Sequence, residues 1–373
     1  MTETEPRTPR PILPFLGTGR GRRLAALTFG TIVAILAVIV SVTRESSETA
    51  VRFKPAAVFP DFETKAAGAN LVTITDKSRA LHLRKIESGT WVVAESHDYP
   101  ASVNRLRGLF LNLSELRAIE LKTDRPDWQA SLGLVSPASG GGATLIDVTD
   151  PNGKSLASLM VGDLQPGGQS GQDRAFIRAN GAAQAYLAEG DIPLETTPSD
   201  WLEPTIVDLP RDRVRRVALT PANGKAYAIS RPTPKDVNFV VENLEPGQAM
   251  VSEIAANGIG AGAINVALDD VRPIGAIDFA GASRIAYETF DGLTVTMDVV
   301  TREDRHWLKV EAAAVAGSSL AAEAQAISKR TGAWAYAIPE WKANLFMKPV
   351  DQLLKSPPAA APVKDDKGKK KSH

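Results

Sequence analysis

The sequence contains no cysteine, and its formal net charge at pH 7 is zero. Without cysteine the protein cannot form disulfides, thiolate nucleophiles, iron–sulfur clusters or cysteine-ligated zinc sites, so its stability depends on packing. The chain has 43 basic and 43 acidic residues, and this balance disfavours a dedicated nucleic-acid-binding protein, because such proteins are usually basic.

Sequence motifs of the common catalytic classes are also missing. There is no Walker A sequence and no G-x-S-x-G motif. The segment Gly168–Gln172 lacks the last glycine of the serine-hydrolase motif and is expected to be a flexible linker. Gly258–Ala263 superficially resembles a dinucleotide-binding loop, but a predicted helix precedes it and a predicted strand follows it, the reverse of the required order. We interpret it as a helix end with a flexible exit.

Histidine is scarce, with four residues in the chain. His82 and His306 lie in predicted strands and are expected to be partly exposed sheet residues. His97 precedes Asp98 in a predicted loop, where the alternative is a metal or acid–base role, because histidine titrates near neutrality. No second histidine stands at ligand spacing from it, and His373 lies in a polar tail. We therefore predict no catalytic residue, no cofactor-binding residue and no metal site.

Adjacent carboxylates and tryptophans are the remaining candidates for a site. Asp269-Asp270, Glu303-Asp304 and Asp365-Asp366 are neighbours whose side chains would point to opposite faces of a strand, and none belongs to an EF-hand ligand series. We expect solvated surface at all three. The tryptophans are expected to anchor the core, with a carbohydrate-binding groove as the alternative: Trp91, Trp128, Trp201, Trp307, Trp334 and Trp341.

The most informative feature present is one apolar run, Leu24–Thr43, which contains no charged residue. A helix of roughly 20 residues is about 30 Å long, enough to cross a bilayer core. Arginines are more frequent before the run than after it, where Glu45 and Glu48 dilute the positive charge. The positive-inside rule then predicts a cytoplasmic leader (1–23), a transmembrane helix (24–43) and export of the remainder.

Three other readings of this run remain open. A cleaved signal peptide usually has a shorter apolar region and small residues at the cleavage site, which Ser41-Val42-Thr43 matches poorly. The paired arginines Arg22 and Arg23 resemble part of a twin-arginine signal. A buried core helix is the third reading. We favour an uncleaved anchor in the inner membrane of a bacterium, which makes the bulk of the chain periplasmic.

After a predicted stalk (44–66), the pattern indicates a first α+β unit (67–205). Three strands are predicted, then a helix opened by Pro100 and Ser102, because apolar residues alternate in the strands and recur every three or four positions in the helix. Two hairpins follow, around Asp150–Gly153 and around Asn180-Gly181. The predicted strands are 71–75, 81–86, 91–93, 143–148, 155–161, 175–178 and 185–187.

The same order of elements recurs in a second unit (212–355). Its predicted strands are 214–219, 225–230, 238–241, 283–290, 293–300, 306–310 and 334–339, and its predicted helices lie around 249–256 and 318–330. We interpret the two units as copies of one β-β-β-α-β-β pattern with a period of about 145 residues. The fold class is α+β with mainly antiparallel sheets. The Lys-rich tail (356–373) is expected to be disordered, with contact to anionic lipid or cell wall as the alternative.

Several of these segments together carry a family resemblance. They are the W-x-V strand, the YPA that leads into a helix ending in LSELRAIE, the LGL of Leu132–Leu134, and the strings GATLIDVTDPNGKSLASLMVGD, AYLAEG, DWLEP and GAWAYAIPEWKANLFMKPVDQLL. In this order they resemble the bacterial family named domain of unknown function 4340 (DUF4340), over residues 68–355. The segment Asn257–Gly262 departs from the family pattern, because it is looser than a leucine-rich helix.

The resemblance implies a role but no site residues. Proteins similar to this one are often encoded beside components of ABC transporters of the gliding-motility or auxiliary-export type. We therefore expect a non-catalytic, membrane-anchored accessory subunit of an ABC-type export or envelope complex, which binds the bilayer through residues 24–43 and does not bind nucleic acid. The alternatives are a module that binds a cell-envelope polymer and an envelope enzyme with an unrecognised site.

Overall fold

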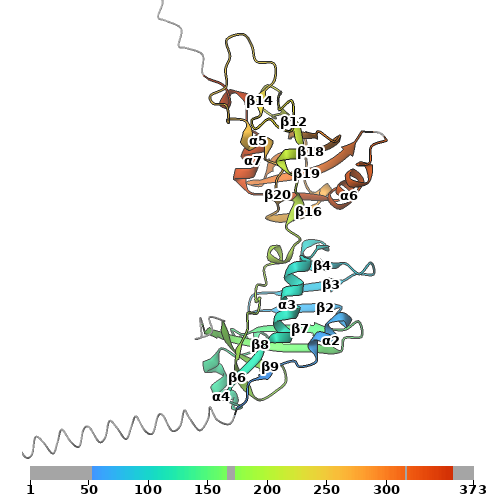
Figure 1. Cartoon of the computed structure of the whole chain (residues 1–373). Helices are drawn as coiled ribbons and strands as arrows, with labels where there is room; N and C mark the ends of the chain where they lie inside the picture. Colours follow the sequence, from blue (N-terminus) through green and yellow to red (C-terminus); the bar gives the residue numbers. More distant parts are fainter. Residues whose placement is uncertain (1–52, 166–172, 316, 356–373) are drawn as a thin grey trace, which may run out of the picture. The chain divides into compact units, whose positions relative to one another are not determined.

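The computed structural model of the protein describes residues 53–165, 173–315 and 317–355 (Figure 1). The predicted leader, the predicted transmembrane helix, residues 44–52 of the predicted stalk, the segment Gly168–Gln172 and the C-terminal tail with Asp365, Asp366 and His373 lie outside the described residues. Within the described ranges, no helix has both the length and the apolar character needed to cross a bilayer.

The described residues form a ten-stranded sheet, an eight-stranded sheet and a small two-stranded sheet, with a few helices. The strand pairs whose register is known are all antiparallel. This confirms the predicted α+β class with mainly antiparallel sheets.

The ten-stranded sheet has the strand order β1-β6-β10-β9-β8-β7-β2-β3-β4-β5. Its helix α3 (Val103–Glu115) lies across β2, β3 and β4 in Figure 1, and its leucines Leu106, Leu109 and Leu113 are buried. Each buried leucine contributes about 1.5–3 kcal/mol of transfer free energy, so this apolar stripe holds helix and sheet together. The strands are β1 (Ala56–Ala57), β2 (Leu71–Thr75), β3 (Ala80–Lys85), β4 (Trp91–Val93), β5 (Tyr99–Pro100), β6 (Arg117–Leu121), β7 (Thr144–Thr149), β8 (Ser155–Gln165), β9 (Arg174–Ala179) and β10 (Ala185–Glu189).

Short helical turns connect these strands. They are α2 (Phe62–Lys65), η1 (Ala66–Gly68), η2 (Ala94–Ser96), α4 (Pro126–Gln129), η3 (Ala130–Leu132), η4 (Pro137–Ser139) and η5 (Pro198–Trp201).

The predicted stalk (44–66) is wrong for its last part. Ala56 of β1 pairs with Ala118 of β6, and Phe62 of α2 is only 1% exposed. Residues from Ala56 onward therefore belong to the first sheet and its core. The physical reason is the burial of Phe62, a large apolar side chain that a solvated stalk would leave in water.

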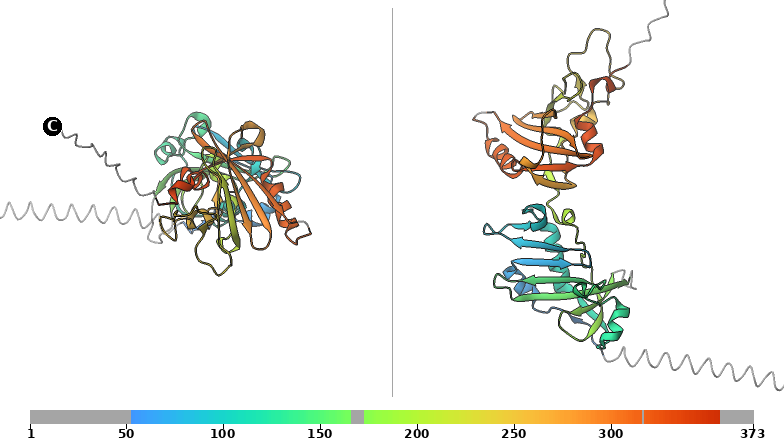
Figure 2. Two further views of the ribbon diagram at one scale, coloured as in Figure 1. Left: turned by 90° about the horizontal axis from the view of Figure 1, so that it is seen from above. Right: turned by 180° about the vertical axis from the view of Figure 1, so that it is seen from behind.

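The eight-stranded sheet has the order β14-β13-β12-β17-β18-β19-β20-β16, and its long strands β18 and β19 run side by side in the right-hand view of Figure 2. Its strands are β12 (Val214–Thr220), β13 (Tyr227–Ser230), β14 (Val240–Val241), β16 (Asp270–Pro273), β17 (Ser283–Thr289), β18 (Leu293–Arg302), β19 (Arg305–Ala314) and β20 (Trp334–Ile338). The two-stranded sheet consists of β11 (Thr205–Val207) and β15 (Val266–Ala267). The helices are η6 (Arg211–Arg213), α5 (Asn257–Gly260), η7 (Ile274–Ala276), α6 (Ala321–Thr331), α7 (Glu340–Phe346) and η8 (Val350–Gln352).

The two large sheets share one strand order. The first contains β4-β3-β2-β7-β8-β9-β10-β6, and the second is β14-β13-β12-β17-β18-β19-β20-β16. In the first sheet, the meander β2-β3-β4 and the meander β7-β8-β9-β10 lie next to each other through their first strands, β2 and β7. In the second sheet, the meanders β12-β13-β14 and β17-β18-β19-β20 lie next to each other in the same way, through β12 and β17. In each sheet, the last strand of the four-stranded meander pairs antiparallel with a strand that comes earlier in the chain, β6 or β16.

The ends of the two units correspond as well. Each begins with a short strand that pairs with a strand following a helix: β1 pairs with β6, which follows α3, and β11 pairs with β15, which follows α5. Each ends in an antiparallel bridge, Ala101 with Leu202 and Met250 with Leu354. We call residues 56–203 the first repeat and residues 205–355 the second repeat, so both begin earlier than the expected positions 67 and 212.

The second repeat differs from expectation in its helices. Residues 249–256 contain the bridge residue Met250, a bend and turns rather than a helix, and Val251 and Ile254 are exposed there. Only the four-residue α5 follows, and a β-carbon on Gly260 would lie 2.3 Å from the ring of Phe239. The close approach of this ring leaves room only for glycine. The expected helix at 318–330 is present as α6, whereas α7 was not predicted.

Candidate functional site

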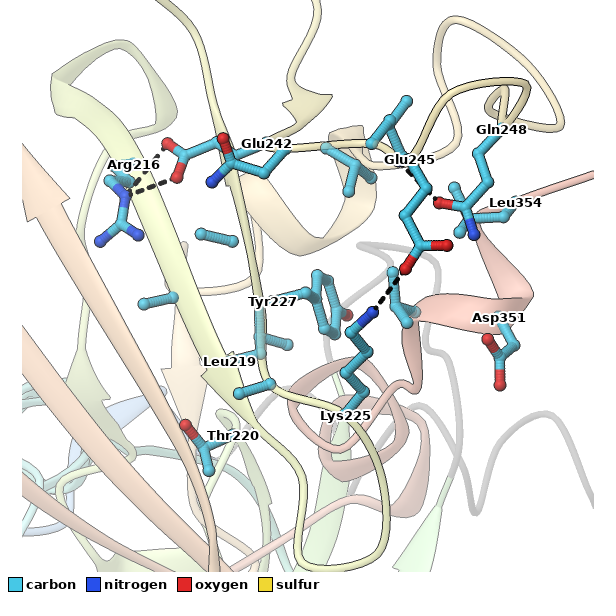
Figure 3. A pocket seen from close by; sticks show the side chains of 17 residues that line it. Arg216, Leu219, Thr220, Lys225, Tyr227, Glu242, Glu245, Gln248, Asp351 and Leu354 are labelled. Atoms are coloured by element: carbon cyan, nitrogen blue, oxygen red, sulfur yellow. Dashed lines mark hydrogen bonds and ion pairs between the residues drawn. The ribbon is translucent and has the colours of Figure 1, made fainter.

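A pocket of about 420 Å³ lies at the β14 edge of the second sheet (Figure 3). Side chains of β12, β13 and β14 form one side of it, and the segments 242–248 and 350–354 form the other. Val241, Leu244, Val350 and Leu354 contribute apolar side chains to the lining, beside charged and polar ones.

Tyr227 of β13 joins the strand to the C-terminal part of the second repeat. Its hydroxyl group donates a hydrogen bond to the carbonyl oxygen of Lys348 at 2.7 Å. Burial raises the pKa of the Tyr227 phenol above its ordinary value. The phenol is therefore neutral at physiological pH and acts as a hydrogen-bond donor rather than as a base.

Arg216 of β12 is held by two carboxylates. Its Nε lies 3.0 and 3.1 Å from the two carboxylate oxygens of Glu242, and its Nη1 lies 2.8 Å from Oε1 of Glu288. Burial alone would lower the pKa of this guanidinium, but the hydrogen bonds and charges of the two glutamates outweigh burial and raise it. The guanidinium of Arg216 therefore already donates hydrogen bonds to two carboxylates of the same sheet.

The rim on the other side is more exposed. Lys225 and Glu245 form an ion pair at 3.1 Å whose side chains are 75% and 62% exposed, so its contribution to stability is small. The backbone N–H of Glu245 donates to Oε1 of Gln248, and the N–H of Gln248 donates to the carbonyl oxygen of Glu245. This turn holds the rim in place.

The cations and the tyrosine that line the pocket are engaged within the protein. Of the ionisable groups that line the pocket, Arg216 and Lys225 are paired with carboxylates, and the Tyr227 hydroxyl donates to a backbone carbonyl. Groups engaged in this way can orient a ligand.

His82 and His306 each have a local side-chain partner. His82 Nδ1 lies 2.6 Å from Oε1 of Glu95, and His306 Nδ1 lies 3.0 Å from the hydroxyl of Thr301. His97 and Asp98 both have left-handed backbones, with φ of 57° and 63°, and Asp98 pairs with Arg84 at 2.6 Å.

Two ion pairs join the described carboxylate pairs, because an arginine that follows each pair in sequence binds a carboxylate of the other pair. Asp270 pairs with Arg305 at 2.6 Å, and Glu303 pairs with Arg272 at 3.0 Å at the β18–β19 turn. Burial raises the pKa of Asp269. Over the described ranges, no group of three or more histidine, aspartate or glutamate residues could hold a metal ion.

The six tryptophans divide into three kinds, of which Trp91 and Trp334 are partly buried. Trp201 and Trp307 are fully buried, which confirms that they anchor the core. Trp128 and Trp341 are 59% and 63% exposed, so the expectation of a core role is wrong for them. Arg125 lies over the ring of Trp128 at 5.4 Å, and the Lys342 ammonium lies over the ring of Trp341 at 4.9 Å.

Two buried cations were not foreseen. Arg231 is 3% exposed and donates to carbonyl oxygens of Val214, Arg211, Asp212, Pro234 and Asp236. Lys342 of α7 is 5% exposed, and its Nζ lies 2.9 Å from the carbonyl oxygens of Gly262 and Ile264. Burial lowers the pKa of this ammonium. The one sequence signal for the burial of Lys342 was its position four residues before Phe346, which places the two side chains on the same face of a helix.

Comparison with known proteins gives a family and no activity. Residues 91–291, more than half of the chain, match the family described as "Domain of unknown function (DUF4340)". This range begins at β4 in the first repeat and ends directly after β17 in the second. No curated protein and no solved structure matches the chain. The extent of the family match means that this chain belongs to the DUF4340 family.

Proposed function

We propose that the protein is a single-pass membrane protein whose folded region is a non-catalytic, exported partner of a membrane complex, of the ABC export type. The observation that carries this proposal is the uncharged apolar run Leu24–Thr43 behind Arg20, Arg22 and Arg23. The pocket of the second repeat supports a binding role, because Arg216 and Lys225 are paired with carboxylates while Leu244 and Leu354 contribute partly exposed apolar side chains to its lining.

The proposal is tested by purification from native membranes. The tagged full-length protein is crosslinked in the cells, solubilised, purified and analysed by mass spectrometry. Stoichiometric recovery of transporter subunits supports the accessory role. Recovery of the protein alone, or from the soluble fraction without detergent, contradicts it. A variant with Ile32→Arg and Leu36→Arg in the apolar run is the control and is expected to abolish membrane association.

The second candidate function is binding of a cell-envelope polymer. The exposed rings of Trp128 and Trp341, each beside a cation, favour it, because aromatic faces stack on apolar faces of sugars. Sedimentation with purified cell-wall polymer is the test. Trp128→Ala and Trp341→Ala should each release the protein, and the control Leu164→Ala, which removes an equally exposed apolar side chain, should not.

A further inference from the structure

The outer side of strand β14 in the second repeat has no partner strand, whereas the corresponding strand of the first repeat has one. In the first repeat, β5 pairs antiparallel with β4, and Tyr99 of β5 lies opposite Val93 of β4. In the shared strand order, β14 holds the place of β4, but it is the last strand of its sheet. The second repeat therefore leaves open the edge that β5 covers in the first repeat.

The backbone of Val241 in β14 points toward this open edge. The N–H of Glu242 donates to the carbonyl oxygen of Ala228 beside β14, and neighbouring residues of an antiparallel strand direct their hydrogen-bonding groups to opposite sides. The N–H and the carbonyl oxygen of Val241 therefore point away from β13, and within the described ranges no hydrogen bond satisfies them. In the first repeat, the carbonyl oxygen of Trp91 in β4 accepts from the N–H of Ala101. An unpaired edge of this kind can bind another strand.

The segment that corresponds to β5 does not cover the edge. β5 lies directly before the bridge residue Ala101, and residues 248–249 hold the same place before the bridge residue Met250. These residues belong to no strand, and the N–H of Val251 donates to the carbonyl oxygen of Leu353. The chain here pairs with the end of the second repeat and leaves β14 free.

Two pockets lie along the free edge. The pocket of Figure 3 is lined by Val241 on the strand and by Gln248 on the facing segment. A second pocket of about 420 Å³ is lined by Val240 on the strand and by Met250 and Glu253 on the facing segment. In the second repeat, the position that β5 fills in the first repeat is therefore hollow.

The surface around this edge is both apolar and acidic. Val237, Val240 and Ile254 are 70%, 47% and 65% exposed. The linings of the two pockets hold four carboxylates and two cations. Asp351 and Glu253 are exposed, and neither forms an ion pair with another described residue. A complementary ligand therefore combines apolar with basic side chains.

We propose that the free edge of β14 binds an extended segment of a partner protein as an added strand, in the position that β5 holds in the first repeat. Large apolar side chains alternate in this segment with lysine or arginine, because successive side chains of a strand point to opposite faces. The model for the apolar position is Tyr99, which is 3% exposed opposite Val93. Hydrogen bonds to the backbone of Val241 give affinity, and the side chains give specificity. This inference concerns the second repeat alone and does not depend on the proposed membrane role.

A labelled synthetic peptide, acetyl-KVKFKVK-amide, is the probe, and its fluorescence anisotropy with the full-length protein in detergent measures binding. The control peptide has the same side chains and charge but carries N-methyl groups on its valines and phenylalanine, so one edge of its backbone cannot donate hydrogen bonds. Methylation should weaken binding by about tenfold or more, because the strand loses several hydrogen bonds to β14. Equal affinities of the two peptides overturn the proposal.

Two variants of the protein test the same edge. Val241→Pro removes the outward N–H and should weaken binding about tenfold, because proline is tolerated on an edge strand whose N–H faces solvent. Asp351→Asn with Glu253→Gln should also weaken it about tenfold through lost charge attraction, and this exposed pair leaves the fold intact. The control is Glu87→Gln with Asp304→Asn, which removes two exposed carboxylates outside both pockets and should leave binding unchanged. An affinity that either edge variant leaves unchanged overturns the proposal.

The oligomeric state of the full-length protein in detergent tests the other occupant of the edge, a second copy of the chain. Light scattering should show the same mass for the natural protein and for Val241→Pro. A dimer that Val241→Pro converts to a monomer overturns the proposal, because the edge would then pair with its own copy.

Discussion

Asp298 links three strands of the second sheet through one carboxylate. Its side chain is 6% exposed, and its oxygens lie 2.7 Å from Arg284 Nε and 3.1 Å from Lys309 Nζ. Arg284 and Lys309 are its register partners on β17 and β19. Burial opposes ionisation of this carboxyl, but the hydrogen bonds and charges of the two cations outweigh burial and lower its pKa.

Asp298→Asn should therefore lower the free energy of unfolding by about 1–3 kcal/mol at pH 7, because it leaves two cations without their partner. Urea unfolding followed by circular dichroism measures this loss. Glu311→Gln is the matched control on β19, because Glu311 is 69% exposed and lies 3.8 Å from the same lysine. If Asp298→Asn lowers the free energy of unfolding no more than Glu311→Gln does, the ion pairs of Asp298 make no measurable contribution to stability.

Arg231 is the second residue whose replacement should be costly. It lies 5.4 Å from the ring of Phe239 and 5.3 Å from that of Phe290 while its nitrogens hold the backbone around Arg211–Asp212. Arg231→Met should lower the free energy of unfolding by about 3 kcal/mol, because several carbonyls lose their donor. Arg215→Met, at a 52% exposed side chain, is the comparison and should cost less than about 1 kcal/mol.

At the scale of the element, α5 is shaped by the ring packed against it. A β-carbon on Gly260 would meet Phe239 at 2.3 Å, whereas one on Gly258 in the same helix would meet Leu345 at 3.5 Å, an ordinary contact. Gly260→Ala should therefore destabilise the protein by about 1–3 kcal/mol through overpacking. Gly258→Ala should be neutral or slightly stabilising. Thermal unfolding of the pair measures the difference, and equal midpoints would show that Phe239 moves aside freely.

Some elements were predictable and others were not, for a common reason. The hairpins at Asn180-Gly181 and Asp291-Gly292 join strands adjacent in sequence, so turn chemistry and alternation identify both strands. The strands β1, β5, β6, β11, β15 and β16 were missed. They have two to five residues, and β6 and β16 pair with β10 and β20, far along the chain. Such short strands have no detectable period and exist because a distant partner satisfies their backbone.

At the scale of the whole molecule, paired carboxylates make the free energy of unfolding depend on pH. The pKa values of Asp298 and Asp291 lie below the ordinary 3.8, and that of Glu195 below 4.5, so the unfolded chain binds more protons than the folded protein in this range. For each group burial alone would raise the pKa, and its hydrogen bonds and paired arginine outweigh burial. The stabilisation is complete above about pH 5 and is lost as the pH falls through the folded-state values.

The free energy of unfolding should accordingly be constant between about pH 5 and 7 and should decline below about pH 4. Urea titrations at a series of pH values measure this dependence. Asp298→Asn should show a shallower decline, because one of the responsible groups is removed. A stability that rises on acidification would contradict the lowered values. The raised pKa of Asp269 contributes in the opposite sense, through the gain of a proton on folding.

Local residue order was enough for the α+β class, for most long strands, for α3 and α6, and for the recognition of the family. Turn residues and apolar periodicity act over a few positions, so they can be read without knowing what the chain packs against. The pocket could not be read in this way. It needs Arg216, Glu242 and Leu354, which lie in separate segments and meet only when β12, β14 and the end of the second repeat are assembled. The burial of Arg231 and Lys342 has the same origin, because a cation leaves water only when the folded backbone supplies carbonyl oxygens from several segments.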